Sequence, residues 1–387
     1  MTKKTFKKSF TQQEPIPEAA IVRAVEVLRG GRLHRYNTLE GETSEAALLE
    51  AEFAAYLGVP YALACGSGGY ALQVALRAAG LASGDKVLAN AFTLSPVPGA
   101  IHNAGGRPIL VETDEDYTID IGDLSQKAAS SRAKYLLLSH MRGHIADMEA
   151  VLEVCQAHEL VLIEDCAHTL GARWNGRMSG TFGKVACFSS QTYKHLNSGE
   201  GGFLASADPE LMARAVVHSG SYMLYGRHLA APDEEVFRKV RLETANMSGR
   251  MDNLLYGALE AELRQVPGLR MPVRPQHEDY VGSSLQFSLP GFGETEIRSF
   301  IELCAARGVE VKWFGAAEPH GFTSRYDSWH FIEDPAELPK TRALLATLCD
   351  LRIPLTFDEA DCRLIGEIIG ECTVETGEAD EIPAAAG

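Results

Sequence analysis

Short apolar runs alternate with amphipathic helices through the first two thirds of the chain, and this alternation constrains the fold most. Strands are predicted at YALAC (61–65), KVLAN (86–90), RPILVET (107–113), KYLLLSH (134–140), LVLIEDC (160–166), VACFSS (185–190) and GGFLASAD (201–208). Helices are predicted in several of the intervals between them. Apolar strands that alternate with helices are typical of an α/β fold, in which helices cover both faces of a mainly parallel sheet.

The length and the change of pattern along the chain predict two main domains. Residues 1–14 are expected to be a mobile arm, and residues 15–260 a large domain that opens with the helix PIPEAAIVRAVEVLRG. After a long helix predicted around 251–265, residues 261–370 read as a smaller α+β domain. The acidic tail 371–387 has few large apolar groups and is predicted to be disordered.

Composition excludes several classes of function. The net charge of -16 disfavours general binding of nucleic acid, which requires a basic surface. No apolar run approaches the roughly 20 residues that span a bilayer, and no hydrophobic segment follows the basic start MTKKTFKKSF. The eight cysteines are scattered without metal-binding spacing. We therefore expect a cytoplasmic protein with reduced thiols and no metal site.

Polar groups and glycines follow the predicted strands, at the edge where such sheets bind ligands. After the first strand, Gly66, Ser67 and Gly68 precede a helix, whose free N–H groups and dipole form an anion site. Further strand ends carry Phe92, Asp165 with His168 three residues later, and Ser189 with Lys194 five residues later.

This set fits pyridoxal phosphate, a cofactor that needs a lysine amine, an anion site and a carboxylate. Lys194 would form a Schiff base with its carbonyl. The phosphate would lie on the Gly66–Gly69 turn within reach of Ser189, and Asp165 would face the pyridine nitrogen. Phe92 would stack on one face of the ring. His168 would pack on the other face or bind the ring oxygen.

Each feature alone has a simpler interpretation. The glycine turn could be an ordinary tight turn, Asp165 a helix cap, Phe92 a core residue and Lys194 a solvated lysine. The turn also partly matches a dinucleotide-binding fingerprint, but no acid follows at the distance that an oxidoreductase would need for the ribose. The order of turn, aromatic, acid and lysine, all at strand ends, favours the cofactor site.

At these motifs the chain resembles the DegT–StrS type of aminotransferase. The resemblance rests on VEVLRGGRLH, ANAFTLSPVPGAI, HMRGHIADMEAV, IEDCAHTLGARWNGRMSGTFGKVACFSS and YKHLNSGEGGFL, and covers roughly residues 15–265. It implies a fold-type I pyridoxal-phosphate enzyme with a seven-stranded sheet. It also implies that Lys194 is the Schiff-base lysine and Asp165 its pyridinium partner. Ser67 and Ser189 would contact the phosphate, while Phe92 and His168 would frame the ring.

The resemblance also implies a homodimer whose active sites each include residues of the partner subunit. The family motif at that place corresponds to NMSGRM here, so Asn246 or Ser248 would complete the phosphate site across the dimer. Arg250 matches the motif.

The residues that would bind the substrate are harder to identify than the cofactor residues, because the C-terminal third of the chain departs from the family pattern. Arg35 and Tyr36 lie where family members bring a loop to the substrate, and Arg142 follows a strand end. Arg325, in EVKWFGAAEPHGFTSRYDSWHF, could clamp a carboxylate.

The predicted function is transfer of an amino group from an amino acid, glutamate or glutamine, to a keto or aldehyde acceptor such as a keto-sugar or cyclitol. Some family dehydratases carry histidine at the lysine position, so Lys194 favours amino transfer. A lyase, dehydratase or decarboxylase that uses the same cofactor remains an alternative. A non-catalytic regulator that binds the cofactor is disfavoured by the net acidity and the lack of a basic helix-turn-helix segment.

Overall fold

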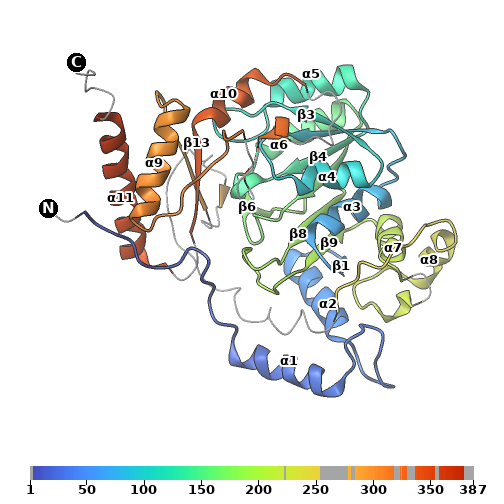
Figure 1. Ribbon diagram of the computed structural model, residues 1–387. Helices are drawn as coiled ribbons and strands as arrows, with labels where there is room; N and C mark the ends of the chain where they lie inside the picture. The colour runs from blue at the N-terminus through green and yellow to red at the C-terminus, as the bar shows by residue number, and fades with distance from the viewer. Residues whose placement is uncertain are drawn as a thin grey trace, which may run out of the picture.

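The computed structural model describes residues 3–221, 224–252, 278–279, 284–317, 323, 325–328, 336–353 and 357–378. A seven-stranded sheet in the order β1-β9-β8-β5-β4-β2-β3 forms the centre of this part of the chain (Figure 1). Its strands are β1 (Tyr61–Cys65), β2 (Lys86–Asn90), β3 (Arg107–Val111), β4 (Tyr135–Ser139), β5 (Val161–Asp165), β8 (Val185–Ser189) and β9 (Gly202–Ser206).

The direction of the strands agrees with the sequence prediction. Strands β3, β2, β4, β5 and β8 pair in parallel, and β9 runs antiparallel to both of its neighbours, β8 and β1. The expected α/β fold with a mainly parallel seven-stranded sheet is therefore confirmed. All seven predicted strands form within one or two residues of their predicted bounds.

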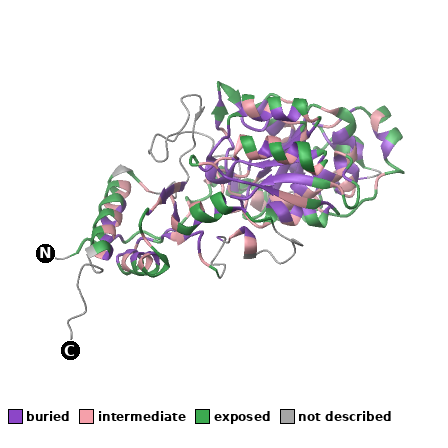
Figure 2. Ribbon diagram, turned by 90° about the horizontal axis from the view of Figure 1, so that it is seen from above, coloured by how far each residue is buried: buried purple, intermediate pink, exposed green. Residues whose placement is uncertain are grey.

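Helices cover both faces because alternate strand residues point to opposite sides. From β1, Leu63 and Cys65 enter a core with the helices on one face, whereas Ala62 and Ala64 enter a core with the helix on the other. The first face carries α3 (Gly68–Ala78), α4 (Pro96–Asn103), α7 (Pro209–His218) and α8 (Glu234–Val240). The second face carries α2 (Glu45–Leu57), α5 (Ile121–Ser131) and α6 (Met148–Ala157). Seen from above, the strands between these layers are mostly buried (Figure 2).

Short elements connect the main ones. They are the helical turns η1 (Met141–Gly143), η2 (Tyr225–Arg227) and η4 (Tyr326–Ser328), and the strands β6 (Arg173–Trp174), β7 (Arg177–Met178) and β10 (Glu278–Asp279). The three strands form a small antiparallel sheet in the order β10-β6-β7.

A second core forms around the antiparallel sheet β11-β13-β12, built from β11 (Ser284–Ser288), β12 (Lys312–Trp313) and β13 (Leu348–Arg352). Helices α9 (Glu294–Ala306) and α11 (Glu359–Glu378) pack side by side on it, and α10 (Pro339–Thr347) precedes β13 (Figure 1). The long helix predicted around 251–265 and the domain boundary at 260/261 fall almost entirely outside the described residues.

Both predicted disordered ends differ from the structure where it describes them. Residues 371–378 are the last turns of α11, and Cys372 and Thr376 are buried there; the rest of the tail lies outside the described residues. Within the arm expected to be mobile, Phe6 and Phe10 are buried in the second core. Phe6, Phe10 and Cys372 enter the same buried cluster, which holds both segments against the second core. The predicted first helix is α1 (Glu18–Gly30), at the edge of the molecule.

Among the helices that the structure describes, none combines the length and the apolar character needed to cross a membrane.

Candidate active site

A pocket of about 600 Å³ opens at the carboxyl ends of the parallel strands. Its floor and walls bring together the glycine turn after β1, the ends of β4, β5 and β8, and the loop that follows β8. The second core contributes residues of β11, β12 and β13, and the N-terminal arm contributes Phe10 and Thr11. Of the cofactor residues predicted from the sequence, Ser67, Gly68, Asp165, His168, Ser189 and Lys194 line this pocket.

The glycine turn presents the start of α3 to the pocket. Ser67 is the N-cap of α3, and its Oγ accepts from the N–H of Tyr70 at 3.1 Å. Gly68 and Gly69 are the first helical residues, so their N–H groups have no acceptor within the helix. A Cβ on Gly68 would lie 2.8 Å from the Cβ of Ser189, and one on Gly202 would lie 2.4 Å from the Gly68 nitrogen. Glycine is therefore required for this close approach, and Gly66 holds the turn through an N–H bond to the Gly249 carbonyl.

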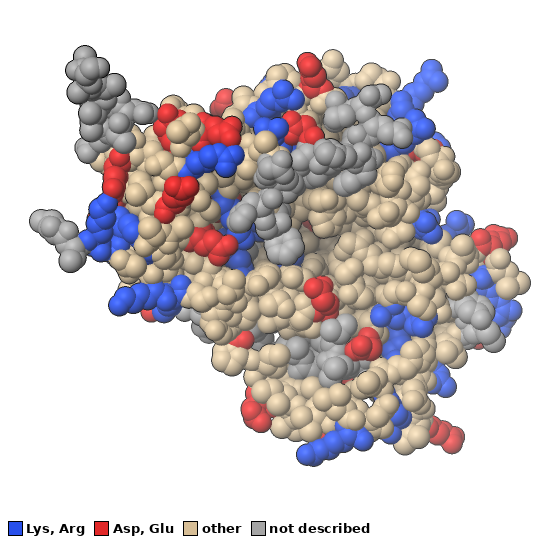
Figure 3. Space-filling view, viewed as in Figure 1, with Lys and Arg blue, Asp and Glu red and all other residues tan. Residues whose placement is uncertain are grey.

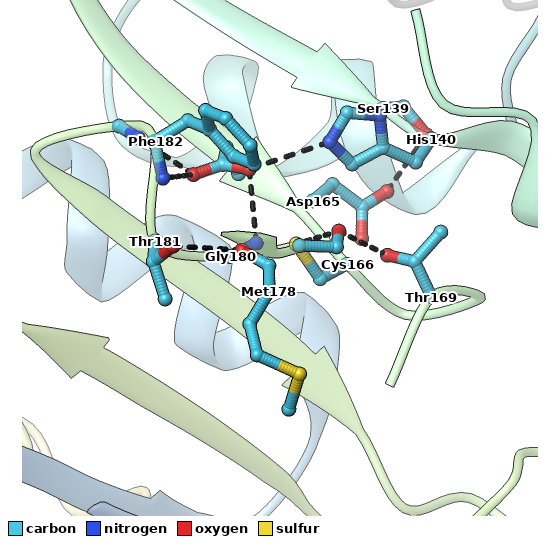
Figure 4. Close-up of polar contacts among 12 residues, drawn as sticks. Ser139, His140, Asp165, Cys166, Thr169, Met178, Gly180, Thr181 and Phe182 are labelled. Atoms are coloured by element: carbon cyan, nitrogen blue, oxygen red, sulfur yellow. Dashed lines mark hydrogen bonds and ion pairs between the residues drawn. The ribbon is translucent and has the colours of Figure 1, made fainter. Parts of the chain in front are cut away.

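Asp165 ends β5 with its carboxylate at the pocket (Figure 4). One oxygen accepts from the Ser139 hydroxyl at 2.8 Å, and the other accepts from the N–H of Ala167 at 3.1 Å. These two bonds fix the carboxylate, which is 7% exposed. No cation of the described residues forms an ion pair with it, so its charge remains available to a bound group.

The preceding residue, Glu164, has a structural role behind the pocket. Its carboxylate accepts from the N–H groups of Gly180, Phe182 and Gly183 and lies 3.4 Å from His140. Ligand atoms of His140, Glu164 and Cys166 lie within 4.8 Å of one another. Burial raises the pKa of the Cys166 thiol well above its usual value, and the carboxylate is already engaged by three donors. Through these contacts Glu164 anchors the turn formed by residues 180–183.

Lys194 and His168 contact each other in the pocket. The Nζ of Lys194 lies 2.7 Å from the Nε2 of His168. Burial and the Arg142 charge lower the pKa of Lys194 to about 7, against the opposing effect of Asp165. Burial and the Lys194 charge lower the pKa of His168 well below its usual value, so its neutral imidazole accepts from Lys194. A lysine in this state is partly neutral near pH 7, as a nucleophile or general base requires.

The loop from Gln191 to Glu200 carries this lysine between two antiparallel strands. The N–H of Ser190 donates to the Gly201 carbonyl, and the N–H of Ser198 donates to the Ser190 carbonyl. These two hydrogen bonds close the loop at its base. His195 follows Lys194, and neither of its ring nitrogens has a hydrogen-bond partner among the described residues. Burial and the Lys194 charge lower the pKa of His195 to about 4, so this ring is neutral.

Two arginines face the pocket from different parts of the chain. Arg142, predicted from the sequence, lies in η1 with a left-handed φ of 55°, and its Nη2 pairs with Asp350 of β13 at 2.8 Å. Arg352 ends β13 and was not identified from the sequence. Its position at a strand end could have marked it as a candidate site residue. However, the strand belongs to the second sheet, and the sequence does not show how the second sheet packs against the first.

Phe92, predicted to stack on the cofactor ring, does not line the pocket. Its side chain is 1% exposed and packs against Tyr117 and Phe314 beneath the pocket, with which it forms a buried cluster. Thr93 and Leu94 of the same segment line the pocket instead. The segment that leaves β2 therefore turns its aromatic side chain into the core, where three rings bury more apolar surface than one would at the pocket wall.

Arg35 and Tyr36 also lie away from the pocket. Arg35 is 1% exposed and makes a bidentate pair with Glu50, at 2.8 and 2.7 Å. The Nδ1 of His228 contacts Glu50 at 2.9 Å, and its Nε2 contacts the Tyr36 hydroxyl at 2.7 Å. Glu50 also accepts from the N–H of Ala64 in β1. This buried network holds the edge strand β1, which leads into the glycine turn. Arg35 and Tyr36 therefore support the site indirectly, through β1.

Arg250 and Arg325 do not line the pocket within one subunit. Arg250 donates to the Gly220 carbonyl at 2.9 Å, and Arg325 pairs with Asp327 at 2.8 Å. Asn246 and Ser248 are exposed, on the segment that leads to Arg250. Their predicted action on a partner subunit stays a prediction.

The pocket fits the cofactor that the sequence predicts. The N–H groups of Gly68 and Gly69 and the hydroxyl of Ser189 are available for a phosphate. The Oγ1 of Thr93 is buried without a hydrogen-bond partner among the described residues, as expected where a ligand supplies one. The carboxylate of Asp165 and the amine of Lys194 complete the set. The fit between these groups and the cofactor does not depend on a metal ion.

The chain is similar in sequence to known proteins. The sequence profile of the DegT/DnrJ/EryC1/StrS aminotransferase family matches residues 18–287. The dTDP-3-amino-3,4,6-trideoxy-alpha-D-glucose transaminase of Streptomyces venezuelae is 32% identical over 346 residues, which are 84% of this chain and 87% of that protein. A putative L-glutamine:3-amino-2,3-dideoxy-scyllo-inosose aminotransferase of Micromonospora echinospora is 36% identical over 219 residues. That match covers 54% of this chain and only 50% of the relative.

The fold agrees with this relationship. The crystal structure of 3-amino-5-hydroxybenzoic acid synthase superposes with a TM-score of 0.78, over 96% of this chain and 99% of that one. The sequence identity of 23% limits this comparison to the fold. On the profile match, the full-length relative and the conserved architecture, the chain belongs to the DegT/DnrJ/EryC1/StrS aminotransferase family.

Proposed function

We propose that the protein is a pyridoxal-phosphate-dependent aminotransferase that transfers an amino group from an amino acid to the carbonyl group of a sugar or cyclitol. The observation that carries the proposal is that Lys194 lines the same pocket as the glycine turn, a suitable anion site, and the fixed carboxylate of Asp165. The pKa of Lys194 is about 7 and its amine contacts the neutral His168, as a reactive amine requires. When bound, the cofactor supplies a carbonyl that accepts the amino group and a pyridine ring that withdraws electrons.

The protein's own residues would divide the work as follows. Gly68, Gly69 and Ser189 would bind the phosphate, and Asp165 would keep the pyridine nitrogen protonated. The Nζ of Lys194 would hold the cofactor and later, as a free amine, move a proton between the reacting carbons. His168 would accept a hydrogen bond from that amine and keep it oriented toward the pocket.

Glutamine or glutamate is proposed as the amino donor. The relative from Micromonospora echinospora is named for L-glutamine and an inosose, and the relative from Streptomyces venezuelae is named for an amino sugar. These names support the donor class and a polyhydroxylated acceptor. Because the match covers only half of the Micromonospora echinospora protein, the amino donor and the acceptor are both proposed here.

A homodimer with shared active sites is also proposed. Asn246 and Ser248 are exposed in one subunit and lie close in sequence to the β1-bound residue Arg250. Exposed polar side chains beside the turn that carries the phosphate are suited to reach a neighbouring site in a symmetric dimer.

The proposed function is tested by three measurements on the purified protein. The visible spectrum should show bound cofactor, and borohydride reduction followed by peptide mapping should place the adduct on Lys194. L-glutamine or L-glutamate should convert the cofactor stoichiometrically to pyridoxamine phosphate, which a lyase or decarboxylase would not do. An adduct on another residue, or none, would refute the proposal.

A further inference from the structure

The N-terminal arm, residues 3–14, is bound along the second core rather than free. Phe6 and Phe10 are 3% and 7% exposed and pack with Phe357. The N–H of Phe6 donates to the Arg307 carbonyl. A Cβ on Gly308 would lie 1.8 Å from the Phe6 carbonyl oxygen, so a glycine is required where the arm crosses the end of α9. The backbone and two aromatic side chains therefore fix the path of the arm.

Charge reinforces this path. Lys3, Lys4 and Lys8 pair with Glu375, Glu367 and Asp361, all on α11. Figure 3 shows blue and red side chains next to one another around the N-terminus and α11. The pairs are largely exposed, so they favour docking of the arm in this register more than they add stability.

Beyond the second core, the arm reaches the pocket and contacts Arg352. Phe10 and Thr11 line the pocket. The carbonyl of Phe10 accepts from Nη1 of Arg352 at 3.2 Å, and Oε1 of Gln13 accepts from Nη2 at 3.1 Å. The guanidinium lies 4.4 Å from the ring centroid of Tyr193, the residue before Lys194. The arm and Tyr193 thus hold this guanidinium at the pocket wall.

The carboxylate of Glu310 lines the same pocket as Arg352, but the two side chains do not form an ion pair. Over the described ranges, Arg352 forms no ion pair, whereas Arg142 pairs with Asp350 and Lys312 pairs with Glu310 at 3.6 Å. Arg142 is 9% exposed, and its Nε is buried without a hydrogen-bond partner in the described part of the chain. Arg142 and Arg352 line the same pocket as Lys194. Burial and the two arginine charges lower the pKa of Lys194, and burial and the Arg142 charge lower the pKa of Arg352.

We propose that Arg352, held by the N-terminal arm and assisted by Arg142, forms a subsite for an anionic group of the substrate, a carboxylate or a phosphate. The proposal rests on the proposed function, because it takes the pocket as the substrate site. An anion here would satisfy the free donor of Arg142 and offset the repulsion between the two guanidinium groups. Arg352 is then a specificity-determining residue, and the arm positions it. The donor's carboxylate or an anionic group on the acceptor would supply the required chemistry.

Binding of glutarate, a dicarboxylate without an amino group, tests the subsite. Calorimetric titration of the cofactor-saturated protein should show that Arg352→Gln weakens glutarate binding by about 10- to 100-fold, the range for loss of charge-assisted hydrogen bonds. Arg298→Gln is the matched control, since Arg298 lies on α9 of the same core and pairs with Glu294 outside the pocket. Equal affinities of wild type and Arg352→Gln would overturn the proposal.

The half-reaction with L-glutamine then identifies the source of the anion. A KM for L-glutamine that rises at least tenfold in Arg352→Gln, with glutarate binding lost in parallel, assigns the subsite to the donor carboxylate. An unchanged KM together with lost glutarate binding assigns it to the acceptor. Both results support an anion subsite at Arg352.

The role of the arm needs a variant that loosens it without touching the pocket. Phe6→Ala removes an anchor of the arm, and Ile368→Ala removes a side chain of α11 from the same buried cluster. Phe6→Ala should weaken glutarate binding several-fold, whereas Ile368→Ala should lower stability but leave glutarate affinity unchanged. Equal glutarate affinity in Phe6→Ala and wild type would overturn the positioning role.

Failure of the proposed function would give a different pattern. If the wild type forms no pyridoxamine phosphate from any amino acid but loses glutarate binding in Arg352→Gln, the aminotransferase assignment fails and the anion subsite stands. If pyridoxamine phosphate forms and Arg352→Gln binds glutarate normally, the subsite fails alone.

Discussion

At the scale of single residues, the chemistry depends on groups whose surroundings change their ordinary properties. Lys194 is a lysine with a pKa near 7 because it is buried beside a cationic arginine. The sequence identified Lys194, Asp165 and His168 because each follows an apolar strand, and strand ends meet at one edge of a parallel sheet. It could not show which way Phe92 turns, since a residue beyond the end of a strand no longer obeys the alternation of the strand.

The lowered pKa of Lys194 predicts a pH-dependent stability in the cofactor-free protein. Between the folded pKa of about 7 and the ordinary lysine value of 10.5, the unfolded state binds more protons, so stability rises with pH across this interval. Lys194→Met removes the effect. The variant should be more stable than wild type at pH 6.5, and this difference should become small by pH 10.5.

Urea unfolding of both proteins at pH 6.5, 8 and 10.5 measures the difference. Lys184→Met is a suitable control, because Lys184 pairs with Asp208 at the surface. A stability difference between wild type and Lys194→Met that does not change with pH would contradict a lysine pKa near 7.

At the scale of elements, close backbone contacts decide whether the anion-binding turn forms. The turn before α3 lies directly against the ends of β8 and β9, at a distance that excludes any Cβ on Gly68 or Gly202. The sequence predicted a glycine turn at an anion site, and a second glycine segment, Gly199–Gly202, leads into β9. The contact between these two glycine segments depends on β1, β9 and β8 being neighbours in the sheet, which strand patterns alone do not specify.

Gly68→Ala should therefore weaken cofactor binding and lower the stability of the protein by about 1–3 kcal/mol, since the new methyl group would collide with Ser189 and the Phe188 carbonyl. Gly99→Ala in α4 is the matched control, because a Cβ there meets no atom within 4 Å. That control should be neutral or slightly stabilising, as alanine favours a helix over glycine. Equilibrium dialysis of pyridoxal phosphate and urea unfolding give the two readouts. Unchanged cofactor affinity in Gly68→Ala would contradict the role of the turn.

The buried Arg35–Glu50–His228 network gives a second prediction at this scale. Although burial opposes ionisation, the charges of Arg35 and His228 hold the pKa of Glu50 at about 2. Glu50→Gln leaves Arg35 buried without a counter-charge and should cost about 3–5 kcal/mol of unfolding free energy at pH 7. Because the folded pKa lies below the ordinary value of 4.5, the contribution of Glu50 is present above pH 4.5 and is lost as pH falls through 2.

Urea unfolding from pH 7 down to pH 3 follows this loss. Glu26→Gln serves as the control, since the Glu26 pair with Arg23 is exposed and should contribute less than about 1 kcal/mol. A Glu50→Gln variant as stable as Glu26→Gln would show that the network does not hold β1.

At the scale of the whole molecule, the pocket is built from two cores and from the N-terminal arm. Arg142 of η1, which follows β4 of the large sheet, pairs with Asp350 of the small sheet, and Gln286 of β11 donates to the same carboxylate at 2.7 Å. The N-terminal arm adds the remaining wall. The sequence predicted a small C-terminal α+β domain, but the arm was predicted to be mobile because the ends of a chain are often poorly ordered.

Subunit mixing tests the proposed dimer at this scale. Lys194→Ala and the double variant Asn246→Ala with Ser248→Ala should each be impaired as homodimers. Mixed dimers should regain one working site, in which the lysine comes from one subunit and the polar side chains come from the other. Amino transfer is assayed before and after subunit exchange, and a sedimentation profile confirms that dimers are present. No gain of activity on exchange would place Asn246 and Ser248 outside the partner's site.

The sequence by itself determined the α/β class, the seven strands and the strand-end positions of Lys194 and Asp165, because alternating apolar patterns and strand-end positions are local signals. Only the tertiary structure decided that Arg352 and the N-terminal arm belong to the pocket, that Phe92 belongs to the core, and that Arg35 and Tyr36 support β1 from behind. The reason is physical. These contacts join residues more than a hundred positions apart or depend on which way a chain turns after a strand, and both follow from the packing of the whole molecule.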